Sequence, residues 1–304
     1  MFIARLQVVH MKQDQIRKGT TGGVVVTGIS SGIGKAIALG LAEKGWPVFG
    51  TVRKEEDRQS LLALGNPRLV PLIYDLNERG GISGLVQSVE SDLRQRGENG
   101  LTALINNAGG SMVGPLELAN VDELSRQFDA RIAGSIALVQ AFLPALRRAS
   151  GRILWIATPG TIPTPWVAGI HAADFAVNCV ARTLALELGR EGPPVILVRC
   201  GGIVTRAGLA TRRDLETCLT TCDQGRRARY DARLAEWARS MEEFDGKRTD
   251  PNAVADLVAR ILEAERPKSR YRIGYMSGAA AFLESLPQVV TDRILAARFD
   301  SSTL

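Results

Sequence analysis

A glycine-rich turn directly after the first apolar run constrains this chain more than any other feature. Residues 24–26 are three valines, and residues 27–34 then read TGISSGIG. Glycines at such a turn let the backbone approach a pyrophosphate closely and adopt angles that a Cβ resists. A helix that begins near Ser31 would offer its free N–H groups to the anion. The pattern predicts a dinucleotide-binding unit at the start of a sheet.

Short β-branched or apolar runs alternate with longer amphipathic segments along the chain. The apolar runs lie at residues 24–26, 47–52, 69–74, 101–105, 152–156 and 195–198. Helix-length segments between strands form right-handed crossovers, which place the strands in a parallel sheet that helices cover on both faces. Residues 172–188 show the helical spacing of three and four most clearly. The pattern predicts a doubly wound α/β fold with a Rossmann-like sheet.

The 304 residues are consistent with one such domain preceded by a tail. Residues 1–22 end in a polar, glycine-rich stretch, so we expect a flexible N-terminal tail there, and Met11 is a second candidate for the start of translation. Residues 23–304 form the predicted domain. Within it, residues 206–247 are charged, arginine-rich and without a strand pattern, which is typical of a lid over a ligand crevice.

Composition excludes several classes of protein. No apolar run approaches the roughly 18 residues that a membrane span needs, and the first ten residues lack the pattern of a secretory signal, so we expect a cytoplasmic protein without a membrane span. The four cysteines are expected to be free thiols, and no metal site is expected. The net charge of +6 comes from arginines that alternate with acidic residues without interleaved aromatics, which argues against nucleic-acid binding.

The turn at residues 27–34, together with the sequence NNAG at residues 106–109, makes the chain similar to the short-chain dehydrogenase/reductase family. The family's TGxxxGxG turn is matched at Thr27, Gly28, Gly32 and Gly34, and the resemblance covers residues 23–280. Residues 267–287 look like the steroid and retinol dehydrogenase-like branch, which implies a bulky hydrophobic small-molecule substrate. Family members commonly pair through their fourth and fifth helices, so the resemblance also implies a homo-oligomer, a dimer or a tetramer.

The end of the second predicted strand indicates which cofactor binds. Arg53 and Lys54 lie where an NAD-binding chain would hold an acidic residue, and the guanidinium group suits a 2'-phosphate. We therefore expect NADP(H), although Arg53 could instead be an ordinary exposed cation. Asp75 stands where members of the family hold the adenine amino group. The expected cofactor-binding residues are Thr27, Gly28, Ser30, Ser31, Gly32, Ile33, Gly34, Arg53, Asp75, Leu76, Asn107, Ala108 and Gly109.

The residues with which this family reduces carbonyl groups are missing. The family uses a tyrosine acid, a lysine four residues later, a serine about thirteen residues before the tyrosine, and an asparagine on the fourth helix. No lysine occurs between Lys54 and Lys247, so a Tyr-x-x-x-Lys pair is impossible in that region. Aligned on the sequence TLALEL at residues 183–188, the four positions of tyrosine, lysine, serine and asparagine hold Ile170, Asp174, Ala157 and Arg131.

Four losses beside an intact glycine turn indicate a rebuilt pocket. Arg131 and Asp174 carry opposite charges and could pair to restore neutrality in a half-buried site, or each could be solvated separately. Thr158 and His171 are thirteen residues apart, so a shift by one residue would make them a substitute dyad. Yet one residue turns a helix by about 100°, which would direct His171 away from the cofactor.

Three functions stay open at this stage. The first is an NADP(H)-binding enzyme of altered chemistry, in which Arg131 and Asp174 lie among Ile170, Trp155 and Trp166 around a bulky hydrophobic substrate. Such an enzyme would isomerise, dehydrate or cyclise its substrate, or reduce an activated C=N or C=C bond. The second is an NADP-dependent oxidoreductase that uses the shifted dyad. The third is a non-catalytic dinucleotide-binding subunit or sensor.

Overall fold

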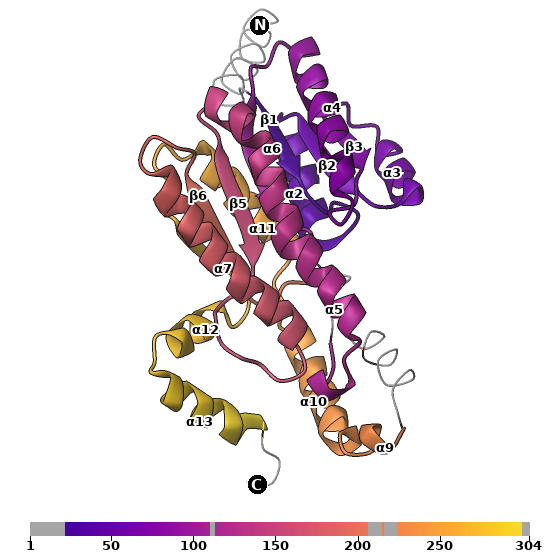
Figure 1. The fold of residues 1–304 in the computed structure, drawn as a ribbon, viewed down its shortest axis with the longest axis vertical. Helices are drawn as coiled ribbons and strands as arrows, with labels where there is room; N and C mark the ends of the chain where they lie inside the picture. The colour runs from indigo at the N-terminus through magenta and orange to yellow at the C-terminus, as the bar shows by residue number, and fades with distance from the viewer. Residues whose placement is uncertain (1–21, 110–112, 206–214, 216–223, 300–304) are drawn as a thin grey trace, which may run out of the picture.

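The computed structural model describes residues 22–109, 113–205, 215 and 224–299. They form a seven-stranded sheet in the order β3-β2-β1-β4-β5-β6-β7, in which all neighbouring strands are parallel (Figure 1). The strands are β1 (Gly23–Val26), β2 (Val48–Val52), β3 (Leu69–Ile73), β4 (Leu101–Asn106), β5 (Arg152–Ala157), β6 (Val195–Cys200) and β7 (Arg270–Ile273). The predicted doubly wound α/β fold is confirmed.

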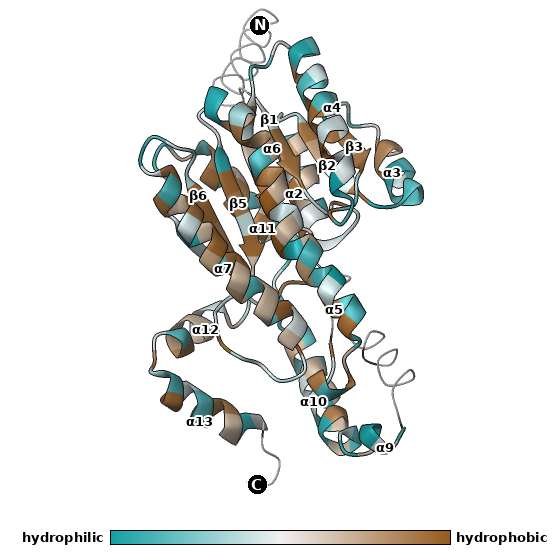
Figure 2. Ribbon diagram, in the orientation of Figure 1, coloured by the Kyte–Doolittle hydropathy of each residue, from teal (hydrophilic) through white to brown (hydrophobic). Residues whose placement is uncertain are grey.

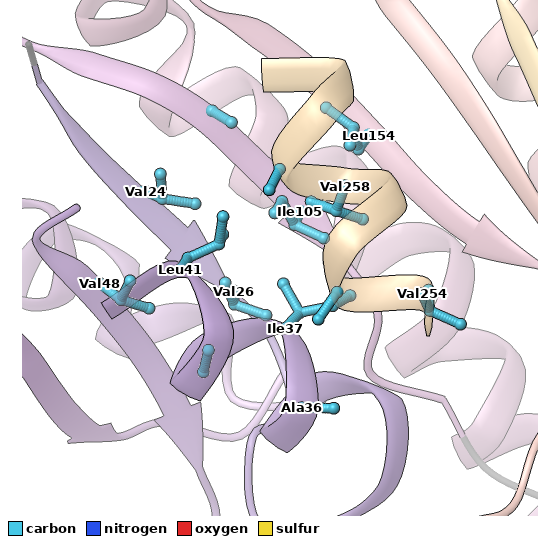
Figure 3. Close-up of a cluster of buried hydrophobic side chains, with 14 of the residues drawn as sticks. Val24, Val26, Ala36, Ile37, Leu41, Val48, Ile105, Leu154, Val254 and Val258 are labelled. Atoms are coloured by element: carbon cyan, nitrogen blue, oxygen red, sulfur yellow. The ribbon is translucent and has the colours of Figure 1, made fainter. Parts of the chain in front are cut away.

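Helices cover both faces of the sheet. On one face, α2 (Gly32–Glu43) and α11 (Pro251–Glu263) pack together over β1 and β4, and Figure 3 shows Ile37, Leu41 and Val258 in this contact. On the other face lie α4 (Ile82–Gln95), α6 (Ser135–Arg148) and α7 (Ala168–Leu188), with Phe142 and Val177 in a second buried cluster. Figure 2 shows mostly hydrophobic strands between helices that carry both hydrophilic and hydrophobic residues. Burial of these two apolar faces accounts for the three-layer arrangement.

The remaining elements are shorter or lie at the edges. They are α3 (Glu55–Leu62), α5 (Val121–Phe128), a π-helical turn (Asp129–Gly134), α9 (Gln224–Arg227), α10 (Asp231–Asp245), α12 (Ser277–Glu284) and α13 (Gln288–Phe299), with 3₁₀ turns at Arg79–Gly81 and Leu116–Leu118. Helices α12 and α13 form a C-terminal arm that extends from the end of the sheet (Figure 1). Residues 1–21 of the predicted tail fall outside the described residues, as do residues 206–214 and 216–223 of the predicted lid.

All six predicted strands are present, but the sequence pattern missed β7. This strand has only four residues and pairs with β6 at the edge of the sheet. Its two arginines point to one face and its two apolar residues to the other, so the segment carries no apolar run. As an edge strand, β7 pairs only with β6, and this pairing is visible only in the folded chain.

One helical stretch is long and apolar enough to cross a membrane by length and composition. Residues Val121–Arg148 run through α5, the π-helical turn and α6, with a mean hydropathy of 1.2 in the most apolar window, 44% of which is buried. Leu138, Phe142 and Leu146 on this stretch are buried in the cluster under the sheet. Their packing is that of a core helix.

Candidate active site

The glycine turn lies at the carboxyl ends of β1 and β4, where the strand order reverses. Gly28 and Gly32 adopt φ angles of 72° and 58°, in the left-handed region. A Cβ on Gly34 would lie 2.2 Å from the carbonyl oxygen of Gly28. The α2 helix begins at Gly32, and the side chain of the preceding Ser31 does not cap it, so the first N–H groups are open to an anion. The crevice outside the strand ends at such a reversal is where nucleotides bind in this type of sheet.

The NNAG segment fastens this turn to the neighbouring strand. The backbone N–H groups of Asn107 and Ala108 each donate to Thr27 Oγ1 at 2.9 Å. The Asn107 side-chain amide donates to the carbonyl oxygens of Thr27 at 3.0 Å and Gly28 at 3.2 Å. Ser30 and Ile33 lie within the same turn. The cradle is therefore prearranged, and the residues present fit a dinucleotide.

Arg53 and Asp75 follow β2 and β3, which are neighbours in the sheet, and so reach the same edge as the turn. Arg53 is exposed, and within the described part of the chain it has no ion-pair partner. Asp75 Oδ1 accepts hydrogen bonds from the backbone N–H of Asn77 at 2.9 Å and from its side chain at 3.3 Å. The buried Leu76 sits beside it. Binding of the 2'-phosphate by Arg53 and of the adenine by Asp75 stays a prediction.

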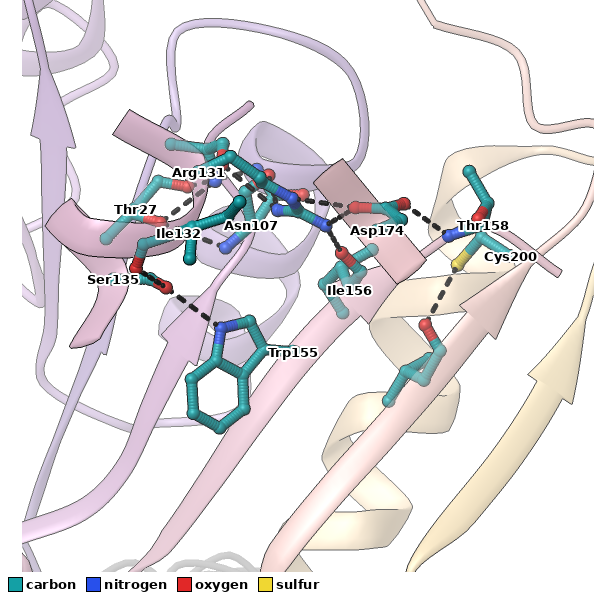
Figure 4. A network of polar contacts seen from close by, with 12 residues as sticks. Thr27, Asn107, Arg131, Ile132, Ser135, Trp155, Ile156, Thr158, Asp174 and Cys200 are labelled. Carbon is teal, nitrogen blue, oxygen red and sulfur yellow. Dashed lines mark hydrogen bonds and ion pairs between the residues drawn. The ribbon is translucent and has the colours of Figure 1, made fainter. Parts of the chain in front are cut away.

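Arg131 and Asp174 form a buried ion pair at the carboxyl ends of β4 and β5 (Figure 4). Arg131 Nε donates to Asp174 Oδ1 at 2.8 Å, and an Nη of the same guanidinium lies 2.7 Å from that oxygen. The side chains are only 8% and 7% exposed. The pairing expected from the two opposite charges is thus present in the fold. Arg131 comes from the π-helical turn, and Asp174 from the second turn of α7.

Further hydrogen bonds make this ion pair a junction between strands. Arg131 Nη1 donates to the carbonyl oxygens of Asn107 at 3.3 Å and Ala108 at 3.0 Å, and Nη2 donates to that of Ile156. Gly109 leaves room for the arginine, since a Cβ there would lie 3.3 Å from its Cδ. Asp174 Oδ2 accepts the backbone N–H of Thr158 at 2.7 Å. The pair therefore ties β4, β5 and α7 together with its hydrogen-bonding capacity largely used.

Thr158 and His171 are not joined in the described structure. His171 Nδ1 lies 2.9 Å from the carbonyl oxygen of Ile162, which makes this nitrogen the donor. Burial lowers the pKa of His171, although the Ile162 carbonyl and Asp174 act in the opposite direction. The backbone N–H of Thr158 donates a hydrogen bond to Asp174 Oδ2, not to His171. His171 is thus a neutral, half-buried ring near pH 7.

Cys200, the last residue of β6, lies beside the ion pair. Burial is the main cause that raises the pKa of its thiol to about 12, and the nearby Asp174 carboxylate adds to this effect. The thiol therefore stays protonated at neutral pH and is a poor nucleophile.

Among the described residues, no group of three or more histidine, cysteine, aspartate or glutamate side chains could hold a metal ion.

Ile170 packs in an apolar cluster with the predicted lid. The buried members are Val113, Leu215, Leu234 and Trp237, and the half-buried members are Trp166, Val167, Ile170, Tyr230 and Met241. The rings of Trp166 and Tyr230 meet edge to face at 5.8 Å, and Tyr230 donates to Glu117 Oε2 at 2.6 Å. Trp166 has a φ of 69°, which is strained for a bulky side chain. The side chain of Ile170 is thus part of an apolar surface.

The sequence interpretation missed an apolar stripe within residues 230–241 of the predicted lid. The spacing by four, three and four residues is that of one helix face, a signal that the surrounding charges obscured at Tyr230, Leu234, Trp237 and Met241.

Trp155 was expected in the pocket, and this was wrong. Its side chain is fully buried between the sheet and the helices, and its indole N–H donates to Ser135 Oγ at 3.3 Å.

Comparison with known proteins places the chain in a family. The model of the family described as short chain dehydrogenase matches residues 23–216. The NADPH-dependent 3-dehydrocapnine reductase of Ornithobacterium rhinotracheale is 28% identical over 285 residues, which cover 89% of this chain and 94% of that protein. The 3-amino-tetrahydro-pyrrolizinone reductase of Xenorhabdus hominickii is 30% identical over 260 residues, which cover 84% of this chain and 87% of that protein.

Solved structures show the same fold. A short-chain dehydrogenase from Streptomyces avermitilis superposes with a TM-score of 0.68 at 22% identity, covering 94% of this chain and 99% of that one. A short chain dehydrogenase from Burkholderia cenocepacia in complex with NADP gives a TM-score of 0.67 at 20% identity, covering 93% and 98%. With the glycine turn, the NNAG segment and the parallel sheet, these matches identify the chain as a member of the short-chain dehydrogenase family of NAD(P)-dependent oxidoreductases.

Proposed function

We propose that this protein is an NADPH-dependent reductase of an activated C=N or C=C bond in a bulky apolar small molecule. One observation carries the proposal. Where the sequence alignment sets the family's tyrosine acid and lysine, the chain has Ile170 and Asp174, and these lie in an apolar cluster and in an ion pair with Arg131. A carbonyl needs a proton donor for its oxygen during reduction. An iminium group needs none, because it already carries the positive charge.

The chemistry balances without an acid from the protein. NADPH supplies a hydride when it is bound. For an iminium carbon, the π pair of the C=N bond moves to nitrogen, and a neutral amine results. For a C=C bond conjugated to a carbonyl, the resulting enolate takes its proton from solvent.

The residues of the chain have three tasks in this scheme. The glycine turn binds the pyrophosphate, and Arg53 binds the 2'-phosphate of the cofactor, which selects NADP(H) over NAD(H). The Arg131–Asp174 pair has no net charge, so the pocket floor does not repel a cation as the ammonium group of a lysine would. Trp166, Ile170 and the apolar side chains of residues 230–241 contact the hydrocarbon part of the substrate.

The shifted dyad has less support. His171 holds its proton on Nδ1 against Ile162, and burial lowers its pKa. A general acid at that position would have to deliver a proton from Nε2, which the neutral ring does not carry.

The test compares an iminium ion with a ketone of matched shape. N-methyl-3,4-dihydroisoquinolinium and α-tetralone share a bicyclic skeleton, and oxidation of NADPH is followed at 340 nm in the spectrophotometric assay commonly used for such enzymes. We expect kcat/KM for the iminium to exceed that for the ketone by about 10²-fold or more, since an acid typically contributes 10²- to 10⁴-fold. Equal or faster turnover of the ketone would contradict the proposal. If His171→Ala then abolished ketone turnover, the dyad would be the catalytic group.

A further inference from the structure

Three arginines project from one face of the sheet at its β6–β7 edge. Arg272 is the neighbour of Arg199 across the two strands, and Arg270 is the neighbour of Leu197, two residues earlier. Side chains two residues apart on a strand point to the same face. That face is the one covered by α7, because Leu197 is buried in the same cluster as Val177.

A fourth arginine joins them from the helix. Arg182 of α7 lies close enough to Arg270 to act on its charge. Burial lowers the pKa of Arg270, the like charges of Arg199, Arg272 and Arg182 lower it further, and Glu284 acts in the opposite direction. We name Arg182, Arg199, Arg270 and Arg272 the β7-edge arginine cluster.

Arg199 is buried with part of its hydrogen-bonding capacity unused. Its side chain is 1% exposed, and its charge is paired with Glu284 of α12 through Nη1. Its Nε is buried without a hydrogen-bond partner in the described structure. The second carboxylate oxygen of Glu284 accepts a hydrogen bond from Thr161 Oγ1 at 2.6 Å.

The cluster has more positive charge than its one carboxylate balances. Within the described part of the chain, no ion pair links Arg182, Arg270 or Arg272 to an acidic residue, whereas many exposed arginines elsewhere have one. Arg270 is half-buried, and Arg182 and Arg272 are exposed, so the outer side of the cluster is open to solvent. Half-buried like charges repel one another, and a bound anion would relieve that repulsion.

We propose that the β7-edge arginine cluster is a binding site for a tetrahedral oxyanion with two negative charges, a phosphate or sulfate, either free or as a group of a small molecule. Planar guanidinium groups match such oxygens with paired hydrogen bonds. The site lies at the β7 end of the sheet, whereas the glycine turn follows β1 near its middle. It is therefore separate from the cofactor site and independent of the proposed reaction.

The test is a calorimetric titration of the full chain with sodium phosphate, at an ionic strength held constant with sodium chloride. We expect saturable binding that Arg270→Gln or Arg272→Gln weakens at least tenfold. The matched control is Arg266→Gln, which removes the same charge from an exposed side chain just before β7 and should change the affinity less than twofold. Arg272 is exposed, so its variant tests the site even where Arg270→Gln impairs folding. Sulfate should compete with phosphate, whereas acetate should not.

Three results would overturn the proposal. Absence of saturable phosphate binding would mean that water alone completes the cluster. Displacement of the phosphate by NADPH, or its loss in Arg53→Gln, would place the anion at the cofactor turn. If Arg270→Gln or Arg272→Gln left the phosphate affinity unchanged and altered the sedimentation coefficient, the cluster would be a contact between two copies of the chain.

Discussion

Single residues decide what the pocket of this protein can do. Arg131 and Asp174 are predicted to stand where the family has an asparagine and a lysine, and the ion pair that they form carries no net charge. The guanidinium group also bonds to three backbone carbonyl oxygens, so it has a structural task that an asparagine does not have. A buried pair of this kind contributes little when intact and destabilises the fold strongly when one partner is removed.

The first prediction concerns this pair. Arg131→Gln and Asp174→Asn should each lower the free energy of unfolding by about 3 to 5 kcal/mol, because each leaves a buried charge without its partner. The double variant should lose less than the two single losses combined. Thermal or denaturant unfolding in a double-mutant cycle measures the difference.

The exposed pair Arg79 and Asp129, 2.9 Å apart, is the control. Its coupling should stay below about 1 kcal/mol. Additive effects for Arg131 and Asp174 would show that the two substitutions are energetically independent, and the case for a rebuilt pocket would then rest on the glycine turn alone.

The second prediction concerns His171. Burial lowers its pKa, so the unfolded chain takes up the proton first as the pH falls below about 6.5. The folded protein therefore loses stability as the pH falls through that value, and the loss is complete below the pKa of the folded state. In His171→Phe, which keeps an aromatic ring beside Phe175, the drop in Tm from pH 7.5 to pH 5.5 should be smaller than in the wild type. An equal drop would show that His171 is protonated as easily in the folded state.

At the scale of secondary-structure elements, the β1–α2 connection is the most constrained part of the chain. Its glycines are needed for different reasons. Gly28 and Gly32 have positive φ angles, whereas Gly34 lies within α2 and leaves space for neighbouring atoms. Helix α10 is amphipathic instead: its buried residues Leu234 and Trp237 pack in the cluster that contains Ile170, and most of its charged residues are exposed.

The third prediction concerns Gly34. A methyl group there would lie 2.2 Å from Gly28 O and 2.4 Å from Asn107 Nδ2. Gly34→Ala should therefore abolish NADPH binding, measured by fluorescence titration, and lower the Tm. Gly84→Ala in α4 is the matched control, since nothing lies within 4 Å of its new methyl group. The control should bind NADPH normally and be more stable by about 0.5 to 1 kcal/mol. Unchanged NADPH affinity in Gly34→Ala would contradict the assignment of the cofactor turn.

At the scale of the whole molecule, the C-terminal arm is fastened to the sheet near the candidate site. Glu284 of α12 accepts hydrogen bonds from Arg199 of β6 and from Thr161 in the segment between β5 and α7. Gly160 in the same segment rests on α12, where a Cβ would lie 3.1 Å from the carbonyl oxygen of Ala280. Thr158, which bonds to Asp174, is two residues away, so the arm supports the edge of the pocket. Pairing of two chains, which the family resemblance implies, stays a prediction.

The fourth prediction concerns this attachment. Glu284→Gln should lower the free energy of unfolding by about 3 to 5 kcal/mol, because it leaves the buried Arg199 without a carboxylate. Thr161→Val removes one neutral donor to the same carboxylate and should cost about 0.5 to 1.5 kcal/mol. Amide hydrogen exchange should become faster in α12 of Glu284→Gln and stay unchanged in α2. Equal protection of α12 in the variant and the wild type would show that other contacts hold the arm.

Local patterns in the sequence determined most of the fold. Six strands, the turn at residues 27–34 and the loss of the Tyr-x-x-x-Lys pair were recognisable because each depends on residues that are neighbours or regularly spaced in the chain. The charges of Arg131 and Asp174 indicated that they could pair, since an unpaired buried charge is costly. Their separation of 43 residues meant that only the fold could bring them together.

Only the tertiary structure decided the features that depend on side chains from distant elements. Trp155 lies in the core, His171 forms a hydrogen bond with the carbonyl oxygen of Ile162, and Ile170 packs in one cluster with residues of α10. The fold also brings together β7 and the four arginines of the β7-edge arginine cluster. No pattern in the sequence near these residues indicates which side chains they lie beside. The physical reason is that burial and hydrogen-bond partners across a sheet are set by strand order and helix packing, and these follow from the whole set of apolar faces in the chain.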